Sequence, residues 1–264
     1  MRLSPDKRTI FLVLLITSLN SQQAFSDGAD GPDSKAYPCH HFAADGGSLE
    51  KFLQSRPLLA LKQHWRKSPE ADLDSGFVSA AWDKEYLYIR ATLSDRDIFN
   101  SLVGFNLPFY QKGDIFEILI RSRDSEAYFE FQITPQNQVL QLMFPCGSSL
   151  SDFKDSGADM DQLIETFKVS QRIVETQAEV NQAKNIWTVL VKIPAQALAS
   201  DSQLWPDDSL RVSFCRYDYT RGKADPVLSS TSDHSIRNFH RQEEWRAMTL
   251  LTKSEASGKA EGLE

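Results

Sequence analysis

Residues 77–93 read FVSAAWDKEYLYIRATL, and this stretch decides the fold. Two runs rich in aromatic, aliphatic and β-branched residues, 77–82 and 86–93, flank a short polar turn that begins at Asp83. Two such runs around a polar turn are the signature of a β-hairpin. The chain is therefore expected to build its core from strands.

Further strand signals follow the hairpin at residues 114–120, 128–133, 139–144, 187–193, 210–215 and 246–251. Helical signals are confined to residues 48–53, 159–165 and 195–199. Many short strands separated by turns are typical of a sandwich or barrel. We predict an all-β protein, an antiparallel β-sandwich of the jelly-roll kind with few short helices, as one domain over residues 37–252.

Residues 1–26 have the pattern of a secretory signal peptide. A Lys-Arg pair precedes an apolar run over residues 10–16, and small residues at Ala24 and Ser26 fit a cleavage site. The run is shorter than the roughly 20 residues that cross a membrane. We expect an exported protein, periplasmic or extracellular, cleaved near Ser26 and without a membrane span; the alternative is an uncleaved N-terminal anchor.

The segments on either side of the domain are polar and rich in small residues. Residues 27–36 predict a flexible leader and residues 253–264 a disordered tail, because neither can build a core. The formal net charge of the chain is -7. Phosphate binding needs a basic surface, so nucleic acid is excluded as a partner. We expect a soluble monomer.

The chain has three cysteines, Cys39, Cys146 and Cys215. In an oxidising compartment at most one internal disulfide can form, and one thiol remains. The sequence does not choose the pair. It also contains no GxSxG, HExxH, P-loop or GxGxxG motif, and these are common marks of catalytic or nucleotide sites. We therefore expect a binding protein rather than an enzyme.

One acidic residue stands on an otherwise apolar strand face. Side chains alternate between the two faces of a strand, so Glu117 shares its face with Ile115 and Leu119. A carboxylate in an apolar row costs several kcal/mol unless it is paired or bound to a metal ion. The pattern predicts a structural or metal-binding role for Glu117.

A later strand passes from apolar to charged. One face ends with Arg216 and Asp218, and the other ends with Tyr217 and Tyr219. One interpretation is a buried pair between Glu117 and Arg216 that fixes the strand register. The other is a ligand-facing cluster at the end of the strand, and the residues leave both open.

Residues 226–245 form a long polar segment inside the domain. Long segments of this kind are usually functional, and this one offers hydroxyl groups, His234, His240 and Arg241. Flat aromatic faces and planar polar groups suit sugars. We interpret the segment as part of a ligand site; the alternative is an ordered edge loop that satisfies its own hydrogen bonds.

Two of the five tryptophans stand in polar surroundings. Trp65 lies among polar and charged residues and Trp205 lies in a predicted loop, whereas Trp82 and Trp187 belong to apolar strands. We expect Trp65 and Trp205 to be exposed stacking platforms. The alternative is that either ring plugs the end of the sandwich.

Several short motifs occur in a fixed order: AWDKEYLYI at 81–89, GDIFEI at 113–118, YFEF at 128–131, WTV at 187–189, IP at 193–194, FCR at 214–216 and HRQEEW at 240–245. Together they resemble the family 9 carbohydrate-binding module and its DOMON-like relatives over most of residues 58–252. The resemblance implies a non-catalytic β-sandwich that holds a sugar end between aromatic rings, often beside structural calcium. It implies a polysaccharide or oligosaccharide as partner, in polysaccharide degradation.

By that likeness, Asp114 and Glu117 match a recurring pattern and are candidate metal ligands, with calcium as the expected ion. Arg216 matches the arginine-bearing strand near the ligand site. The candidate ligand-binding residues are Trp65, Trp205, Arg216, Tyr217, Asp218, Tyr219, His234, His240 and Arg241.

Two other functions are alternatives. DOMON-like relatives include b-type cytochromes, and a haem-binding domain would need axial ligands, for which Met143, Met248, His234 and His240 are available. A glycoside hydrolase would need two carboxyl groups that face each other across the sugar, and its candidates are Asp95, Asp97, Asp114 and Glu117.

Overall fold

The computed structural model describes residues 36–43, 47–198 and 210–252. Its strands are β1 (Tyr37–His41), β2 (Leu59–Ala60), β3 (Gly76–Trp82), β4 (Tyr86–Ser94), β5 (Ile115–Ser122), β6 (Tyr128–Ile133), β7 (Val139–Phe144), β8 (Glu175–Asn181), β9 (Ile186–Pro194), β10 (Leu210–Asp218), β11 (Val227–Ser230) and β12 (Arg246–Leu251). Its helices are α1 (Leu49–Gln54), α2 (Ser149–Asp155), α3 (Met160–Phe167) and α4 (Ala195–Leu198), with short 3-10 turns at Phe109–Gln111, Gln182–Lys184 and Gln242–Glu244. The predicted all-β class is confirmed.

The hairpin predicted from residues 77–93 is formed by β3 and β4. The two strands pair from Gly76 opposite Leu93 to Trp82 opposite Leu87. Its turn is held by Asp83, whose Oδ1 accepts hydrogen bonds from the backbone N–H groups of Glu85 and Tyr86, each at 2.8 Å. A short acidic side chain that bonds the backbone two or three residues on is a standard way to close a turn.

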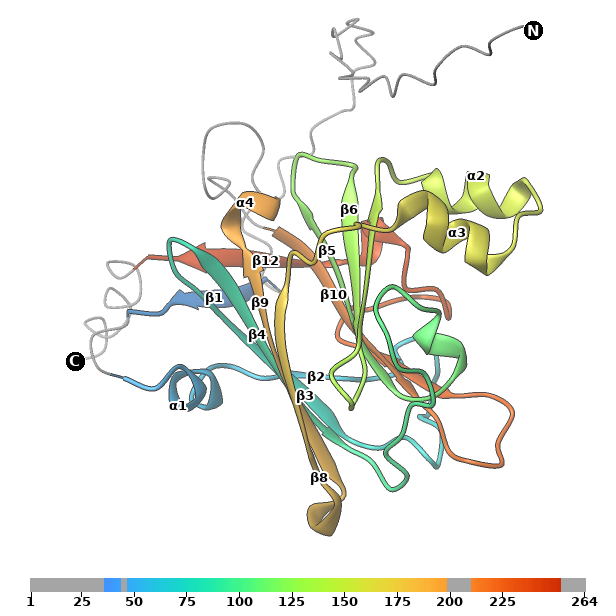
Figure 1. The fold of residues 1–264 in the computed structure, drawn as a ribbon. Helices are drawn as coiled ribbons and strands as arrows, with labels where there is room; N and C mark the ends of the chain where they lie inside the picture. Colours follow the sequence, from blue (N-terminus) through green and yellow to red (C-terminus); the bar gives the residue numbers. More distant parts are fainter. Residues whose placement is uncertain (1–35, 44–46, 199–209, 253–264) are drawn as a thin grey trace, which may run out of the picture. The chain divides into compact units, whose positions relative to one another are not determined.

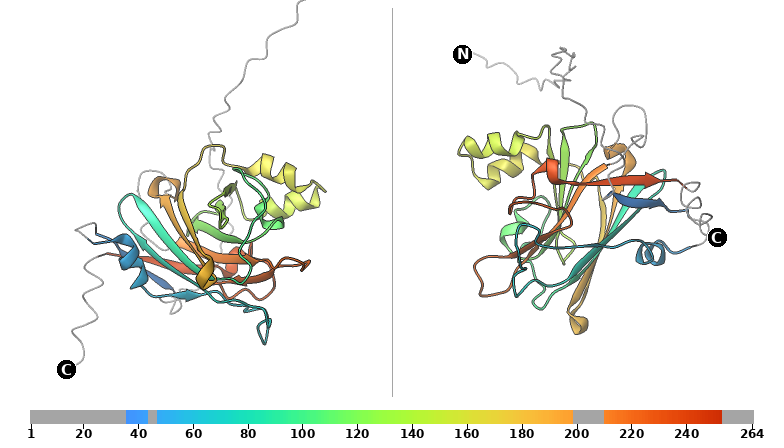
Figure 2. Two further views of the ribbon diagram at one scale, coloured as in Figure 1. Left: turned by 60° about the horizontal axis from the view of Figure 1, so that its bottom comes forward. Right: turned by 180° about the vertical axis from the view of Figure 1, so that it is seen from behind.

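The strands form one curled sheet in the order β7-β6-β5-β10-β12-β1-β3-β4-β9-β8, with β11 beside β10 and β2 beside β3. Most neighbours are antiparallel, but β1 pairs in parallel with both β12 and β3. The first and last strands therefore join two halves, β7-β6-β5-β10 and β3-β4-β9-β8. Figures 1 and 2 show how the curl turns the halves toward one another.

The space between the halves is filled by apolar side chains. Ile89 from β4, Phe116 from β5, Trp187 from β9 and Phe214 from β10 are fully buried in one cluster. These residues come from alternate positions of their strands, as expected where one face of each strand meets a core. This cluster is called the sandwich core below.

The two outer faces of the sandwich differ. On the β4-β9-β8 side, β8 alternates between exposed and partly exposed residues. On the β5-β6-β7-β10 side, a second apolar cluster lies between the sheet, the helices α2 and α3, and the segment before β12. Figure 1 shows α2 and α3 together at this side of β6.

The α2–α3 pair was only half predicted. The helix expected at residues 159–165 is α3, and Asp159 caps it in a reciprocal box with Gln162. The preceding α2 was missed, because its seven residues are rich in serine and offer only Leu150 and Phe153 as apolar positions at helical spacing. Together the two helices cover a sheet face that the strand pattern alone left open.

Several sequence predictions fall on residues outside the described ranges: the signal peptide, the leader, the tail and Trp205. None of the helices that the structure describes is long and apolar enough to cross a membrane. Cys39, Cys146 and Cys215 are all free thiols. Cys39 lies in the sandwich core and Cys215 in the second cluster, on opposite sides of the sheet.

Candidate functional site

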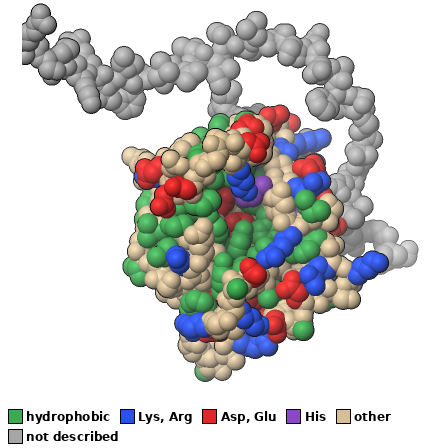
Figure 3. Space-filling model, turned by 90° about the vertical axis from the view of Figure 1, so that its right-hand side faces the viewer, with side chains coloured by type: hydrophobic (Ala, Val, Ile, Leu, Met, Phe, Trp, Pro, Cys, Tyr) green, Lys and Arg blue, Asp and Glu red, His purple; other side chains and the backbone are tan. Residues whose placement is uncertain are grey.

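A cavity of about 480 Å³ opens on the outer face of the β5-β6-β7-β10 half. Its walls and floor are formed by Tyr110, Glu117, Glu130, Gln132, Leu140, Leu142, Phe144, Leu150, Lys154, Met160, Leu163, Ile164, Tyr217, Leu228, Arg237, Asn238, Phe239 and His240. Figure 3 shows this face as a hollow with hydrophobic side chains inside, acidic side chains in its depth and basic ones near the rim. Cavities of about 300–1,000 Å³ with a few polar groups are the usual form of a small-ligand site.

The apolar wall comes from strand alternation and from the helix pair. Leu140, Leu142 and Phe144 lie on one face of β7, and Leu150 from α2 and Leu163 from α3 pack against them. The two helices thus enclose the cavity instead of leaving the sheet face open to water.

The floor is polar because β5 and β6 bring three side chains together. Glu117 lies opposite Gln132, and Glu130 is two residues from Gln132 on the same face of β6. The Nε2 of Gln132 donates to Oε1 of Glu117 at 3.2 Å and to Oε1 of Glu130 at 2.6 Å. One amide group therefore holds both carboxyl groups in place.

Two acceptor atoms on this floor are left without a partner. Glu117 is 1% exposed and Gln132 is 2% exposed, yet Oε2 of Glu117 and Oε1 of Gln132 accept no hydrogen bond. Buried polar atoms are nearly always hydrogen-bonded, and an exception calls for an explanation. Because both residues line the cavity, a bound ligand can supply the missing donors.

The two carboxyl groups resist ionisation. Burial, followed by the neighbouring Glu130, raises the pKa of Glu117 well above its usual value. Burial also raises the pKa of Glu130 to about 7, against the opposing effect of the hydrogen bond from Gln132. At neutral pH the pair therefore holds at least part of a shared proton.

Aromatic rings line the remaining side. Tyr217 packs edge-on against Phe239 with ring centroids 5.7 Å apart, and Tyr110 lies 6.1 Å from Tyr217. The Nδ1 of His240 lies 3.0 Å from the hydroxyl oxygen of Tyr128. Burial lowers the pKa of His240 to about 3, so its ring is neutral at physiological pH.

A second polar cluster lies on the other face of β5, at one end of the sandwich core. Asp95, Asp114 and Asp218 are buried, and one carboxylate oxygen from each lies within 4.8 Å of the others. Arg216 is fully buried among them, with its Nη2 at 3.0 Å from Asp95 Oδ2 and 3.1 Å from Asp218 Oδ2. This set is called the aspartate cluster below.

Backbone geometry fixes Asp114. Gly113 has φ of 144°, and a Cβ there would lie 2.4 Å from the carbonyl oxygen of Phe99. The chain can therefore run close enough for the backbone N–H groups of Phe99 and Tyr219 to donate to the Asp114 carboxylate, at 2.7 and 2.8 Å. Glycine is required where a backbone must approach this closely with positive φ.

The aspartate cluster holds three carboxyl groups against one guanidinium. Burial and the nearby Asp95 raise the pKa of Asp114 to about 8, and burial raises that of Asp218 to about 7 despite Arg216. The three carboxylates could hold a metal ion, and oxygen-only donors fit a hard cation such as calcium.

The structure separates the predicted metal pair. Side chains alternate along β5, so Asp114 faces the aspartate cluster and Glu117 faces the cavity. Asp95 and Asp218 stand beside Asp114 in place of Glu117. For the same reason the buried pair between Glu117 and Arg216 does not form, and Arg216 pairs with the aspartates.

The predicted ligand residues divide among several places. Tyr217 and His240 line the cavity, whereas Arg216 and Asp218 belong to the aspartate cluster. Tyr219 supports both sites, because its N–H binds Asp114 and its hydroxyl group donates to the carbonyl of Tyr110 at 2.5 Å.

The other predicted residues stand behind the cavity lining. Trp65 packs against Phe239 with ring centroids 6.0 Å apart. His234 is fully buried, and its Nδ1 lies 3.2 Å from Glu244, which also pairs with Arg241 at 3.1 Å. These contacts brace the segment that carries Phe239 and His240.

The residues proposed for the alternative functions converge only in part, because Asp95 and Asp114 meet in the aspartate cluster whereas the others lie outside it. Met248 belongs to the sandwich core and Met143 projects from β7 away from the cavity wall, whereas His234 and His240 lie on the cavity side. Neither Met143 nor Met248 therefore lies on the same side of the sheet as the two histidines. Among the proposed hydrolase carboxyls, Asp97 pairs with Arg221 at the surface.

Sequence reasoning missed Glu130, Gln132, Tyr110 and Phe239. The signal for the first two was present, because alternation in YFEFQI puts Tyr128, Glu130 and Gln132 on one face. That polar row resembles a solvent-facing strand until α2 and α3 are known to cover it.

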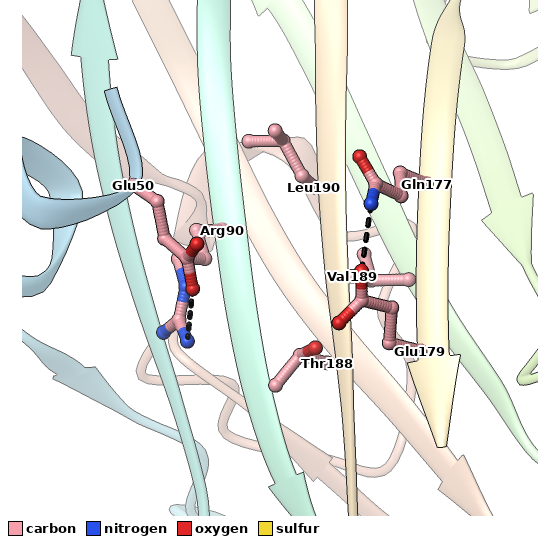
Figure 4. A pocket seen from close by; sticks show the side chains of 7 residues that line it. All are labelled: Glu50, Arg90, Gln177, Glu179, Thr188, Val189 and Leu190. Carbon is pink, nitrogen blue, oxygen red and sulfur yellow. Dashed lines mark hydrogen bonds and ion pairs between the residues drawn. The ribbon is translucent and has the colours of Figure 1, made fainter. Parts of the chain in front are cut away.

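A second depression lies on the outer face of β4, β9 and β8, with a volume of about 60 Å³. Figure 4 shows its side chains, among them the Glu50–Arg90 ion pair at 3.9 Å and the Gln177–Glu179 hydrogen bond at 2.7 Å. It is far smaller than the cavity under α2 and α3 and is not treated as a ligand site.

No known protein family matches the sequence, and no curated protein matches it. Solved structures do share its fold. A family 9 carbohydrate-binding module from Caldicellulosiruptor kristjanssonii in complex with cellotriose is 11% identical, with a TM-score of 0.56 over 84% of this chain and 97% of that one. The same module in complex with glucose is 10% identical, with a TM-score of 0.56 over 84% and 98%.

A third structure belongs to a protein from Bacteroides uniformis that is named for carbohydrate binding. It is 12% identical, with a TM-score of 0.55 over 82% of this chain and 97% of that one. At this identity the likeness concerns the fold alone. The described part of the chain has the fold of the family 9 carbohydrate-binding modules, as its ordered motifs implied.

Proposed function

We propose that this protein is a non-catalytic carbohydrate-binding protein that holds a sugar or glycan end in the cavity under α2 and α3. The observation that carries the proposal is the pair of buried, unpartnered acceptors, Glu117 Oε2 and Gln132 Oε1, that line an apolar cavity. Sugar hydroxyl groups can donate to both acceptors while apolar side chains cover the C–H faces of the ring. The structural neighbours, which bind cellotriose and glucose, support it.

Binding is favoured over hydrolysis by the position of the carboxyl groups. Glu117 and Glu130 project from neighbouring strands on one floor, and a single amide group holds both. A glycosidase needs its two carboxyl groups on either side of the scissile bond. The floor is thus suited to hold one end of a sugar.

The decisive experiment is a binding screen of the full chain against soluble oligosaccharides and polysaccharides, by calorimetry and affinity electrophoresis. In the variant Leu163→Trp the larger ring fills the cavity, and we expect affinity to fall at least tenfold. Thr188→Trp, in the small depression of Figure 4, is the matched control and should bind as the wild type does. If Leu163→Trp is folded and binds normally, the ligand lies elsewhere.

Two further features belong to the same proposal. Calcium is the ion proposed for the aspartate cluster, where it would offset the excess of carboxylates over the Arg216 guanidinium and tie β5 to β10. Export is proposed from the N-terminal pattern of residues 1–26, in line with a role on extracellular or periplasmic polysaccharide. Mass spectrometry of the secreted chain tests cleavage near Ser26.

A further inference from the structure

The cavity floor carries hydrogen-bond acceptors and two carboxyl groups. Among the described residues, no lysine or arginine side chain forms an ion pair with these carboxyl groups. Among the residues that the structure describes, the one basic group within ion-pair distance of Glu117 or Glu130 is His240, at 3.8 Å from Glu130 Oε2. The Nδ1 of that ring faces the Tyr128 hydroxyl oxygen at 3.0 Å. Glu117 is 1% exposed and Glu130 is 5% exposed, so water does not solvate them as it does a surface pair.

The hydrogen bonds of the floor lead to the same point. The amide of Gln132 already donates to both glutamates, while Oε2 of Glu117 and Oε1 of Gln132 accept nothing. The floor has used the donors of its central amide, and the proton that Glu117 and Glu130 share is a further donor between the two carboxyls, so Gln132 Oε1 and one carboxyl oxygen stay free. A ligand that completes it has to bring several donors to one point.

The ligand groups that could donate to the cavity floor differ in their charge. A hydroxyl group brings one donor and no charge, so the paired carboxyls would still have to share a proton or bury a net negative charge. An ammonium group brings three donors and a positive charge, and bonds between ionised partners are roughly twice as strong as neutral ones. The aspartate cluster shows the contrast, since there Arg216 supplies the cation.

We propose that the cavity selects a sugar that carries a protonated amine, with the ammonium group bound by Glu117 and Glu130. The inference rests on the carbohydrate site proposed above and narrows its ligand class to amino sugars. The acceptor Gln132 Oε1 takes a third hydrogen bond. The aliphatic wall of Leu140, Leu142 and Leu163 covers the ring on the side away from the amine.

Lys154 sharpens the inference because it also lines the cavity, from α2. It forms no ion pair with Glu117 or Glu130 within the described part of the chain, but its charge opposes the rise in the pKa of Glu130. As a like charge that acts on the same floor, it weakens the binding of an ammonium group and leaves neutral sugars unaffected. Its removal therefore separates the two ligand types.

The test compares three trimers on the folded full chain by calorimetry: the glucosamine trimer, its N-acetylated counterpart and cellotriose. At pH 6.5 we expect the glucosamine trimer to bind at least ten times more tightly than the two neutral trimers. Glu117→Gln and Glu130→Gln should each abolish that preference, so that each variant binds the glucosamine trimer no more tightly than it binds the neutral trimers. Lys154→Met should raise affinity for the glucosamine trimer several-fold, and Glu179→Gln, at the small depression, is the matched control.

The outcomes separate the two proposals. If the neutral trimers bind in the cavity as tightly as the amine, the amino-sugar inference is overturned and the carbohydrate site stands. If the amine binds but the glutamate variants change nothing, its attraction to the acidic chain is non-specific and the inference is again overturned. If no sugar in the broad screen binds the folded chain, the proposed function fails and the inference with it.

Discussion

Two groups of buried carboxyls lie on opposite faces of β5, and the protein treats them differently. In the aspartate cluster the chain supplies Arg216 and backbone N–H groups from Phe99 and Tyr219. On the cavity floor it supplies one glutamine amide and leaves two acceptors free. Both groups have raised pKa values because burial disfavours the charged form.

A structural site and a candidate ligand site can be distinguished by the partners that the chain itself supplies to their buried carboxyl groups. The aspartate cluster, at the ends of β4, β5 and β10, receives a cation from the chain itself, although Asp95 Oδ2 and Asp218 Oδ2 meet Arg216 as ion pairs without a hydrogen bond. Among the described residues no lysine or arginine pairs with the carboxyls of the cavity floor, and the proposed ligand would complete their free acceptors. The contrast between the two sites predicts how strongly four changes should alter the stability of the protein.

Arg216→Met should have the largest effect. It leaves three buried carboxyls without their protein cation, and loss of one partner from a buried ion pair costs about 3–5 kcal/mol. Urea unfolding in the presence of a chelator measures the change in the free energy of unfolding. A variant as stable as the wild type would show that Arg216 does not compensate the aspartates.

Calcium should stabilise the wild type through the aspartate cluster alone. At about 100 times the dissociation constant, a ligand that binds only the folded state adds about 2.7 kcal/mol to the free energy of unfolding. The thermal midpoint, measured with calcium and with chelator, should rise in the wild type and in Glu117→Gln but not in Asp114→Asn. An unchanged response in Asp114→Asn would place the ion elsewhere.

Glu130→Gln should change how stability depends on pH. The folded-state pKa of Glu130 is about 7 against an ordinary value of 4.5, so its contribution is complete below about pH 4.5 and is lost as the pH rises through 7. Relative to the wild type, the variant should therefore gain about 2.5 kcal/mol between pH 4.5 and 7. His240 changes stability in the opposite sense below pH 6.5 but is present in both proteins.

The comparison is made with urea midpoints of both proteins at four pH values. A difference between them that stays constant from pH 4.5 to 8 would mean that Glu130 titrates normally. The floor would then be wet, and its carboxyls would need no ligand to complete them.

Glu50→Gln gives the smallest effect and calibrates the others. Its ion pair with Arg90, at 3.9 Å, is exposed on the Glu50 side. Exposed pairs of this kind contribute about 0–1 kcal/mol, so the urea midpoint should hardly move. A large loss here would show that the measurements report a general response to charge removal.

Local patterns predicted most of the strands, because alternation and turns are local, but they missed β1, β2, β8 and β11. The bounds of β6, β7 and β12 were read correctly, and the hairpin of β3 and β4 was read from its Asp83 turn. Alternation also put Glu117 on an apolar face, which the structure retains. Alternation could not predict which strands pair with one another, or which residues lie opposite one another in the sheet.

The candidate site depended on those neighbours. Glu117 and Gln132 meet through the β5–β6 register, and Asp95, Asp114 and Asp218 meet from three separate segments. The cover over the cavity depends on α2, whose short serine-rich run gives only a weak helical pattern. Sequence reasoning therefore found Tyr217 and His240 but could not assemble the floor beneath them.

The parallel pairing of β1 with β12 has a consequence for how the domain folds. Tyr37 lies beside Met248, and β1 in turn joins β3. The seam between the two halves is thus made from β1 and β12, so the sheet cannot join the two halves until residue 251 has been synthesised. Contacts so distant along the chain slow the search for the native state. Until β12 has been synthesised, the two halves of the newly made polypeptide stay unjoined, and the apolar surfaces of the future core stay accessible to other proteins.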